Sequence, residues 1–302
     1  MAPIKTVAIA GASGSLGSVI FQRLVASGKF KVRVLRRLGS GSQFPAGTDV
    51  VDVDFGSADA VKAALAGQDA VVSALSTGGE GSQKALVDGA VAAGVQRFLP
   101  SDFGSNLDNP NAQKLPVYGP KIEGQRYLEE RAKGTGLTWT RVYNNAFLDW
   151  GLKHKFIADV SGTAATTVYN GGDLPFSTTT LASVGDGVVG VLSHPDETAN
   201  RSVKIHNAAI TQNQLVAWAR RAAPNKTFDV VNTTLDEVTA AADARLAKGL
   251  FDMQTFAPYL MRAVFDPQYG GNFTGKTDNE LLGVKELSEE EIFQVVKAHV
   301  PA

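Results

Sequence analysis

The stretch Gly11-Ala12-Ser13-Gly14-Ser15-Leu16-Gly17 decides the fold of this 302-residue chain. It follows a short apolar run at residues 5–10, and it opens residues 14–27, where apolar positions recur at helical spacing. Glycines in a strand-to-helix turn let the backbone approach a pyrophosphate, and the helix N-terminus offers free N–H groups and a positive dipole end. We therefore predict a dinucleotide-binding loop, with cofactor contacts from Gly11, Ser13, Gly14, Ser15, Leu16 and Gly17.

The rest of the first half alternates between strand and helix patterns. Apolar, strand-like runs occur at residues 30–35, 50–55, 70–75, 95–99 and 137–142, and a further one is expected near 202–206 after a helix around 184–192. Strands separated by helices indicate βαβ units and a parallel sheet that is covered on both faces. We predict an α/β fold, a doubly wound parallel sheet of the NAD(P)-binding Rossmann type, with a smaller α/β C-terminal substrate domain. The nucleotide-binding domain would span residues 1–152 with a returning segment near 180–207, and residues 153–302 would form the substrate-binding portion.

The second half is less regular. Residues 215–222 and 235–248 show helical patterns, and Ser288-Glu289-Glu290-Glu291 is a capping box before a final helix. Residues 251–273 are rich in Phe, Tyr and Met, and two interpretations stay open for them: core packing, or a lid and wall over an apolar substrate.

Composition excludes several classes of protein. The absence of Cys excludes disulfides, thiolate nucleophiles and Cys-based metal sites. The four histidines show no His-x-x-x-His spacing, so we predict no metal site. A net charge of -1 argues against nucleic acid as a partner, and no long apolar run indicates a membrane span. The N-terminus lacks the pattern of a signal peptide, so we expect a cytoplasmic protein.

The end of the second strand selects the nucleotide. An NAD-binding sheet usually places Asp or Glu there to hold the ribose hydroxyls, whereas this chain has Arg36-Arg37 and no acid as far as Gln43. Two guanidinium groups can grip a 2′-phosphate, although both could also be solvated surface arginines. We therefore predict NADPH as the cofactor. Further contacts are expected from Asp54 and Phe55 after the third strand, and from Ser76 and Thr77 after the fourth.

Several stretches resemble one family. They are the glycine loop, Val34–Arg37, Val71–Ala74, residues 83–94, Arg97-Phe98-Leu99-Pro100-Ser101-Asp102-Phe103-Gly104, the helix from Lys121, Asn144-Asn145-Ala146-Phe147 and Asn213–Val216. Over roughly residues 4–235 the sequence resembles the isoflavone reductase-like branch of the NmrA-like atypical short-chain dehydrogenases. That branch includes phenylcoumaran benzylic ether reductases and pinoresinol–lariciresinol reductases.

The resemblance implies a role for Lys121, because the family's proposed general acid/base is a lysine at the start of the corresponding helix. Glu129 keeps the family's offset from Lys121, whereas Gln125 replaces a usual arginine. A partly desolvated lysine beside a cationic nicotinamide has a lowered pKa that suits acid/base work, while most helix lysines are simply solvated. The resemblance also implies cofactor contacts from Ser101, Phe103, Lys121 and Asn145.

Substrate contacts are expected from both halves of the chain. Asn145 and Phe147 follow the sixth strand and emerge at its carboxyl end. Tyr118 is a second candidate for lining the pocket, although its spacing from Lys121 is one residue short of a Tyr-x-x-x-Lys pair. Helical spacing within the aromatic stretch selects Phe256 and Tyr259.

The expected activity is an NADPH-dependent reductase that transfers hydride to an aromatic or conjugated small molecule, such as a benzylic ether, an enone or a carbonyl compound. The alternative is a non-catalytic, NmrA-like sensor that binds NADP(H) and regulates a partner. The absence of a Gly-x-Ser-x-Gly elbow argues against a serine hydrolase. A homodimer is an assembly that the sequence leaves open.

Overall fold

The computed structural model of the chain describes residues 2–76 and 78–301. Its main sheet has seven strands in the order β10-β6-β5-β4-β1-β2-β3, and every neighbouring pair is parallel. The strands are β1 (Thr6–Ala10), β2 (Lys31–Arg37), β3 (Asp49–Val53), β4 (Ala70–Ser73), β5 (Arg97–Leu99), β6 (Thr138–Tyr143) and β10 (Arg201–Lys204). The order reverses between β1 and β4, so the crevice between their carboxyl ends is where a sheet of this kind binds its ligand.

Helices cover both faces of this sheet. On one face α1 (Ser15–Ala26) packs against α7 (Leu181–Ser193), which in turn contacts α11 (Asn279–Leu282). The other face is covered by α2 (Ala58–Leu65), α3 (Glu80–Ala93) and α5 (Gly119–Ala132). The predicted fold, an α/β doubly wound parallel sheet, is therefore confirmed.

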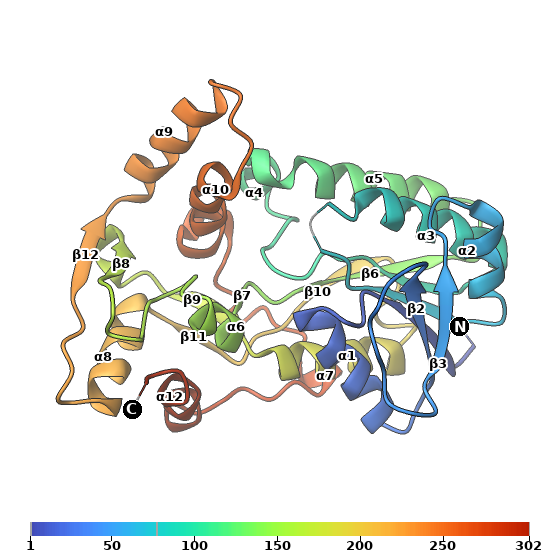
Figure 1. Ribbon diagram of the computed structural model, residues 1–302, viewed down its shortest axis with the longest axis horizontal. Coiled ribbons are helices and arrows are strands. Elements are labelled where there is room, and N and C mark those ends of the chain that lie inside the picture. The colour runs from blue at the N-terminus through green and yellow to red at the C-terminus, as the bar shows by residue number, and fades with distance from the viewer. Residues whose placement is uncertain (1, 77, 302) are drawn as a thin grey trace.

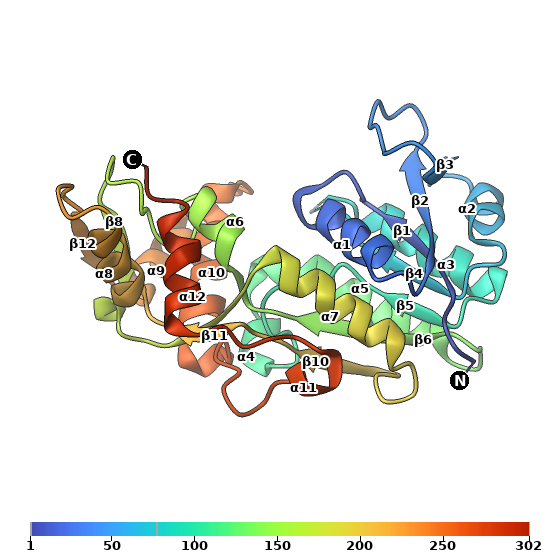
Figure 2. The ribbon, with the colours of Figure 1, turned by 90° about the horizontal axis from the view of Figure 1, so that it is seen from below.

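A second, smaller lobe lies beside the sheet, and both views in Figures 1 and 2 show the two side by side. It contains a three-stranded sheet, β11-β9-β7, and a two-stranded one, β12-β8. Its strands are β7 (Ala146–Phe147), β8 (Thr166–Tyr169), β9 (Phe176–Thr179), β11 (Ala208–Ile210) and β12 (Val230–Thr233). Its helices are α6 (Leu148–Lys153), α8 (Gln212–Ala222), α9 (Leu235–Leu246), α10 (Met253–Phe265) and α12 (Glu289–Lys297). The short helices α4 (Pro110–Gln113) and η1 (Pro116–Tyr118) lead into α5.

The predicted helix signals act as expected. Ser288 and Glu291 form the capping box that begins α12. Gly94 ends α3 in the left-handed conformation, with φ of +73°, which glycine adopts without the steric cost of a Cβ. Among the described helices, none combines the length and the apolar character needed to cross a membrane.

Glycines let α7 approach its neighbours closely. A Cβ at Gly190 would lie 2.3 Å from the carbonyl oxygen of Leu282, and one at Gly185 would lie 2.7 Å from Cγ of Arg23. The first distance is to backbone of α11, which cannot move aside as a flexible side chain can. Helix α7 thus joins the C-terminal segment to the face of the sheet that carries α1.

A buried arginine ties the sheet to the segment that follows α7. Arg97 on β5 is fully buried, and its guanidinium donates to Oγ1 of Thr140 at 2.9 Å and to Oγ1 of Thr198 at 2.8 Å. It also donates to the carbonyl oxygen of Pro195. Burial lowers the pKa of Arg97 to about 10, and Asp196 opposes this shift. The side chain therefore remains charged at neutral pH and holds the chain between α7 and β10 against β5 and β6.

We expect Arg97→Met to lower the free energy of unfolding by about 2–4 kcal/mol, because buried oxygen atoms lose a charged donor. Denaturant unfolding followed by circular dichroism measures this change. Lys133→Met is the matched control, since Lys133 is exposed and its ion pair with Glu130 lies at the surface. Equal midpoints for the two variants would contradict the role given to Arg97.

Candidate active site

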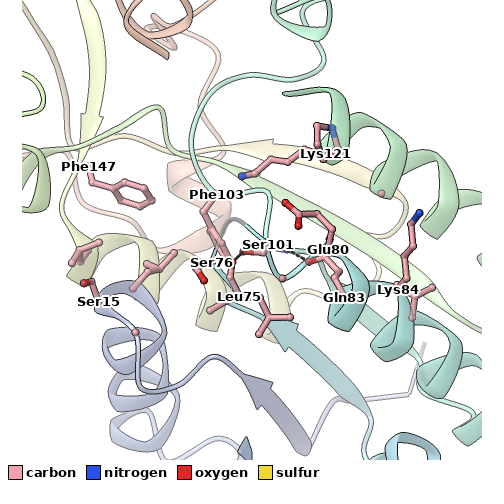
Figure 3. A pocket seen from close by; sticks show the side chains of 18 of the residues that line it. Ser15, Leu75, Ser76, Glu80, Gln83, Lys84, Ser101, Phe103, Lys121 and Phe147 are labelled. Atoms are coloured by element: carbon pink, nitrogen blue, oxygen red, sulfur yellow. Dashed lines mark hydrogen bonds between the residues drawn. The ribbon is translucent and has the colours of Figure 1, made fainter. Parts of the chain in front are cut away.

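A cavity of about 390 Å³ lies at the carboxyl edge of the main sheet, within the size range of small-molecule sites. Six segments line it: the glycine loop, the β4–α3 connection with the start of α3, the segment after β5, the first turns of α5, the β7–α6 segment and the start of α7. Figure 3 shows side chains from these segments directed into it. The cavity therefore contains the topological switch point and extends toward the second lobe.

The glycine loop has the geometry that the sequence predicts. Gly11 has φ of +83°, and a Cβ there would lie 2.4 Å from the carbonyl oxygen of Ala74. A Cβ at Gly17 would lie 2.1 Å from the carbonyl oxygen of Gly11. No side chain caps the N-terminus of α1, and Gly14, Ser15 and Leu16 line the cavity. The free N–H groups and the dipole of α1 thus fit a pyrophosphate, and Ser13 lies exposed on the same loop.

Arg36 and Arg37 differ in their surroundings. The guanidinium of Arg36 donates to Asp52 on β3 through Nε at 2.6 Å and Nη2 at 2.8 Å, and Nη1 donates to the carbonyl oxygen of Ser42 at 2.9 Å. Arg37 is exposed and forms no ion pair with any residue that the structure describes. Arg37 is therefore the freer of the two for a 2′-phosphate, while Arg36 has two N–H groups left after its bonds to Asp52 and Ser42.

The remaining predicted cofactor residues divide into two groups. Ser76, Ser101 and Phe103 line the cavity, whereas Thr77 lies outside the described residues. Ser101 is held in place because its Oγ donates to the carbonyl oxygen of Leu75 at 2.7 Å and its N–H donates to Oε1 of Gln83 at 2.8 Å (Figure 3). Asp54 and Phe55 do not line this cavity: Asp54 accepts a hydrogen bond from the N–H of Gly56, and Phe55 packs beside α2.

Lys121 lies in the first turn of α5, and its side chain extends into the cavity (Figure 3). Within the described residues its ammonium group has no hydrogen bond and no ion pair within 4 Å. Burial lowers the pKa of Lys121 below its usual value, and the carboxylates of Asp102 and Glu80 oppose this shift. An unpaired, partly desolvated lysine is a suitable general acid or base.

Asp102 is the buried carboxyl group behind Lys121. The residue is 2% exposed, its Oδ2 accepts a hydrogen bond from Nε2 of Gln125 at 2.9 Å, and its Oδ1 has no hydrogen-bond partner among the described residues. Nε of Arg141 lies 3.8 Å from Oδ2. Burial raises the pKa of Asp102, whereas Lys121, Gln125 and Arg141 act in the opposite direction. Sequence reasoning named Asp102 only as part of a motif, because its burial beside Lys121 depends on the fold.

An apolar wall faces Lys121 across the cavity. Phe147, predicted from the sequence, lines it together with Phe103, Trp150 and Leu181. Trp150 was missed: it lies on α6, whereas Phe147 ends β7, and only the fold brings both side chains to the cavity. Asn145 has φ of +48° and is buried behind this wall, where its Nδ2 donates to the carbonyl oxygen of Ser177 at 2.9 Å. It does not line the cavity.

Three predicted substrate contacts lie elsewhere. Tyr118 is buried and its hydroxyl donates to Oγ of Ser105 at 2.8 Å, while the hydroxyl of Tyr259 donates to Asp243. Phe256 packs half-buried against the same hydrophobic cluster. No residue of 251–273 lines the cavity. Most of the apolar side chains of α10 pack into two hydrophobic clusters, one within the second lobe and one shared with the segment before α5 and with β6, so this stretch contributes to core packing.

The sequence matches the NmrA-like family over residues 3–257. The chain belongs to this family. Oxidoreductase aprR of Aspergillus flavus is 33% identical over 293 residues, which cover 95% of this chain and 96% of that protein.

Among solved structures, crystal structures of pinoresinol-lariciresinol and phenylcoumaran benzylic ether reductases align with a TM-score of 0.80 at 20% identity, over 98% of this chain and 100% of that chain. A complex of AtPrR2 with NADP+ and (+)pinoresinol aligns with a TM-score of 0.72 at 19% identity, over 99% and 100% of the two chains. These similarities confirm the predicted family, the fold and the class of oxidoreductase. The NADP+ in the AtPrR2 complex agrees with the predicted cofactor.

For this NmrA-like protein we expect Arg37→Ala to weaken NADPH binding about ten- to a hundredfold, because a charge-assisted bond contributes about 1.5–3 kcal/mol. Affinity for NADH, which lacks the 2′-phosphate, should stay unchanged. Arg36→Ala should act in the same direction but less strongly, since Asp52 already occupies one edge of that guanidinium. Calorimetric titration of both nucleotides measures the ratio of their affinities. Equal losses of affinity for NADPH and NADH would contradict a contact between Arg37 and the 2′-phosphate.

Proposed function

We propose that this NmrA-like protein is an NADPH-dependent reductase of aromatic or conjugated small molecules, with Lys121 as general acid/base. One observation carries the proposal: the unpaired ammonium group of Lys121 lies in the same cavity as the glycine loop and faces an apolar wall. When bound, NADPH would supply a hydride, which carries two electrons to an electrophilic carbon of the substrate.

The chain's own residues would hold the nucleotide at both ends. Backbone N–H groups of Ser15 and Leu16, at the N-terminus of α1, would bind the pyrophosphate. Arg37, assisted by Arg36, would pair with the 2′-phosphate. Ser76, Ser101 and Phe103 line the cavity between the glycine loop and Lys121, which is the path toward the reacting end.

Lys121 would hold the proton that completes the reduction. As an electrophilic carbon accepts hydride, negative charge develops on the conjugated oxygen, and a proton from Nζ of Lys121 neutralises it. The product has gained one hydride and one proton, and Lys121 is left neutral until solvent protonates it again. The lowered pKa of Lys121 makes this proton easier to release than that of a solvated lysine.

The apolar wall favours a flat, aromatic substrate. Phe103, Phe147 and Trp150 present three aromatic side chains to one cavity. Stacked or edge-on contacts between aromatic rings add about 0.5–1.5 kcal/mol to the free energy gained by burying their surface. A short aliphatic carbonyl compound would leave much of this wall uncovered.

We expect Lys121→Met to lower turnover by about 10²- to 10⁴-fold while NADPH affinity changes little, as for loss of a general acid. The assay follows NADPH consumption with a panel of enones, quinone methides and aromatic ethers. Lys114→Met, at an exposed position before α5, is the control. Normal turnover in Lys121→Met would reject the role, and binding of NADPH without turnover of any compound would instead favour a redox sensor.

The same reaction should depend on pH in a defined direction. Turnover that needs protonated Lys121 falls as the pH rises through the pKa of Lys121, which burial places below the ordinary lysine value. The carboxylate of Asp102 favours the ammonium form, so Asp102→Asn should lower this pKa further. The decline in turnover should then begin at a lower pH than in the wild type.

Phe147→Ala should raise KM for aromatic substrates about ten- to a hundredfold, because one buried aromatic side chain contributes about 1.5–3 kcal/mol. Phe251→Ala is the matched control, since Phe251 is 71% exposed and lies outside the cavity. Steady-state kinetics with an aromatic and an aliphatic enone distinguishes a loss of aromatic contacts from a general loss of substrate binding. A Phe147 variant that loses both substrates equally would contradict an aromatic wall.

A further inference from the structure

Among the charged side chains that line the cavity, Lys84 has an ion-pair partner, whereas Glu80 and Lys121 have none among the described residues. Three charged side chains line it: Glu80, Lys84 and Lys121. Nζ of Lys84 lies 3.2 Å from Oε1 of Glu123, so its charge has a partner. Glu80 and Lys121 form no ion pair within 4 Å, with each other or with any other described residue. Figure 3 shows both side chains extending into the cavity, Glu80 from α3 and Lys121 from α5.

The carboxylate of Glu80 is only partly satisfied by the protein. Glu80 is the first residue of α3, and its Oε1 accepts a hydrogen bond at 3.1 Å from the N–H of Gly78, which precedes the helix. The side chain is half-buried, and among the described residues the N–H of Gly78 is the one hydrogen-bond donor to its carboxylate. A carboxylate in such surroundings is stabilised by a ligand that brings a donor with it.

Lys121 and Glu80 would bind opposite kinds of group on the ligand, because an ammonium donates hydrogen bonds and a carboxylate accepts them. Lys121 donates, so it suits the oxygen on which charge develops, and Glu80 accepts, so it suits a hydroxyl or N–H group. The coupling between the two is direct, because the carboxylate of Glu80 favours the charged form of Lys121. A ligand that spans them must carry a donor on the α3 side of its reacting oxygen.

We propose that Glu80 is a specificity-determining residue that accepts a hydrogen bond from a hydroxyl or N–H group of the substrate, and so selects compounds with a free donor over their alkylated forms. This inference rests on the proposed function, since it places the donor relative to the oxygen that Lys121 protonates. It assigns Glu80 a role beyond its hydrogen bond to Gly78 at the start of α3.

The variant Glu80→Gln separates the two roles of this side chain. The amide oxygen of Gln can still accept from Gly78, so the start of α3 is kept, whereas the charge that strengthens a hydrogen bond to the substrate is lost. Glu130→Gln is the matched control, because it makes the same change at an exposed position on α5. Thermal unfolding of both variants checks that the fold is retained.

The probes are the ortho, meta and para isomers of hydroxybenzylideneacetone, each paired with its methyl ether. Binding to the NADP+-loaded protein is measured by calorimetry, and kcat and KM are measured with NADPH at a pH below the decline seen for the wild type. We expect at least one hydroxylated isomer to bind about tenfold more tightly than its ether, and Glu80→Gln to abolish most of that difference. Glu130→Gln should preserve it.

Four results would overturn the inference. If Glu80→Gln weakened the binding of hydroxylated and methylated probes equally, Glu80 would only stabilise the start of α3. If the variant lost affinity for NADPH, Glu80 would bind the cofactor. A wild type that reduces the probes through Lys121 without preferring the free hydroxyl would refute the inference while leaving the proposed function intact. Failure to bind or reduce every probe would count against both.

Discussion

The close approach of two backbone segments determines how the site is built. At Gly11 and Gly17 the first β–α connection lies against itself and against the end of β4 so tightly that a Cβ would meet a carbonyl oxygen at 2.4 Å or less. This contact fixes the start of α1 at the point where the strand order reverses. The positive end of α1, the β4–α3 connection and the segment after β5 consequently share one cavity. A larger residue at either glycine would move the helix away from all of them.

Gln125 on α5 affects the charge near Lys121, because its side chain contacts the buried carboxylate of Asp102. The family resemblance gives an arginine where this chain has Gln125, and an arginine there could satisfy both oxygens of a facing carboxylate. Gln125 donates to one oxygen of Asp102 only, and the other oxygen has no partner. Nε of Arg141 lies 3.8 Å from Oδ2 of Asp102, so the protein balances this carboxylate through Gln125 and Arg141 on one oxygen only. Asp102 from behind and Glu80 from the cavity both favour the ammonium form of Lys121, against the effect of burial.

Sequence reasoning succeeded where a signal is local and repeated. The apolar strands, the capping box at Ser288 and the glycine loop each carry their own pattern, and the sheet follows from the alternation of strands and helices. The second lobe was harder, because strands such as β7 and β11 span two or three residues and have no period to detect.

The sequence does not reveal the positions of several site residues, because these depend on contacts between segments that are distant in the chain. The bond from Arg36 to Asp52 depends on the register of β2 and β3, which places the two residues opposite each other. The sequence leaves open whether α10 packs into the core or lines the cavity, because an aromatic helix face does not reveal which surface it covers. Tyr259 packs against α9 and the segment before α5 instead of the sheet edge.

The order of the strands along the chain affects when the main sheet can be completed during synthesis. Strand β10, at the edge of the main sheet, and α7, on its face, come after β8 and β9 of the second lobe. On the ribosome, the first lobe therefore emerges with one edge of β6 unpaired and one side of α1 uncovered, and it stays so until residues 181–204 appear. By then part of the second lobe has already been synthesised. The main sheet is therefore completed only after β8 and β9 have been synthesised, when Arg97 can bind Thr198 and Pro195 of the returning segment.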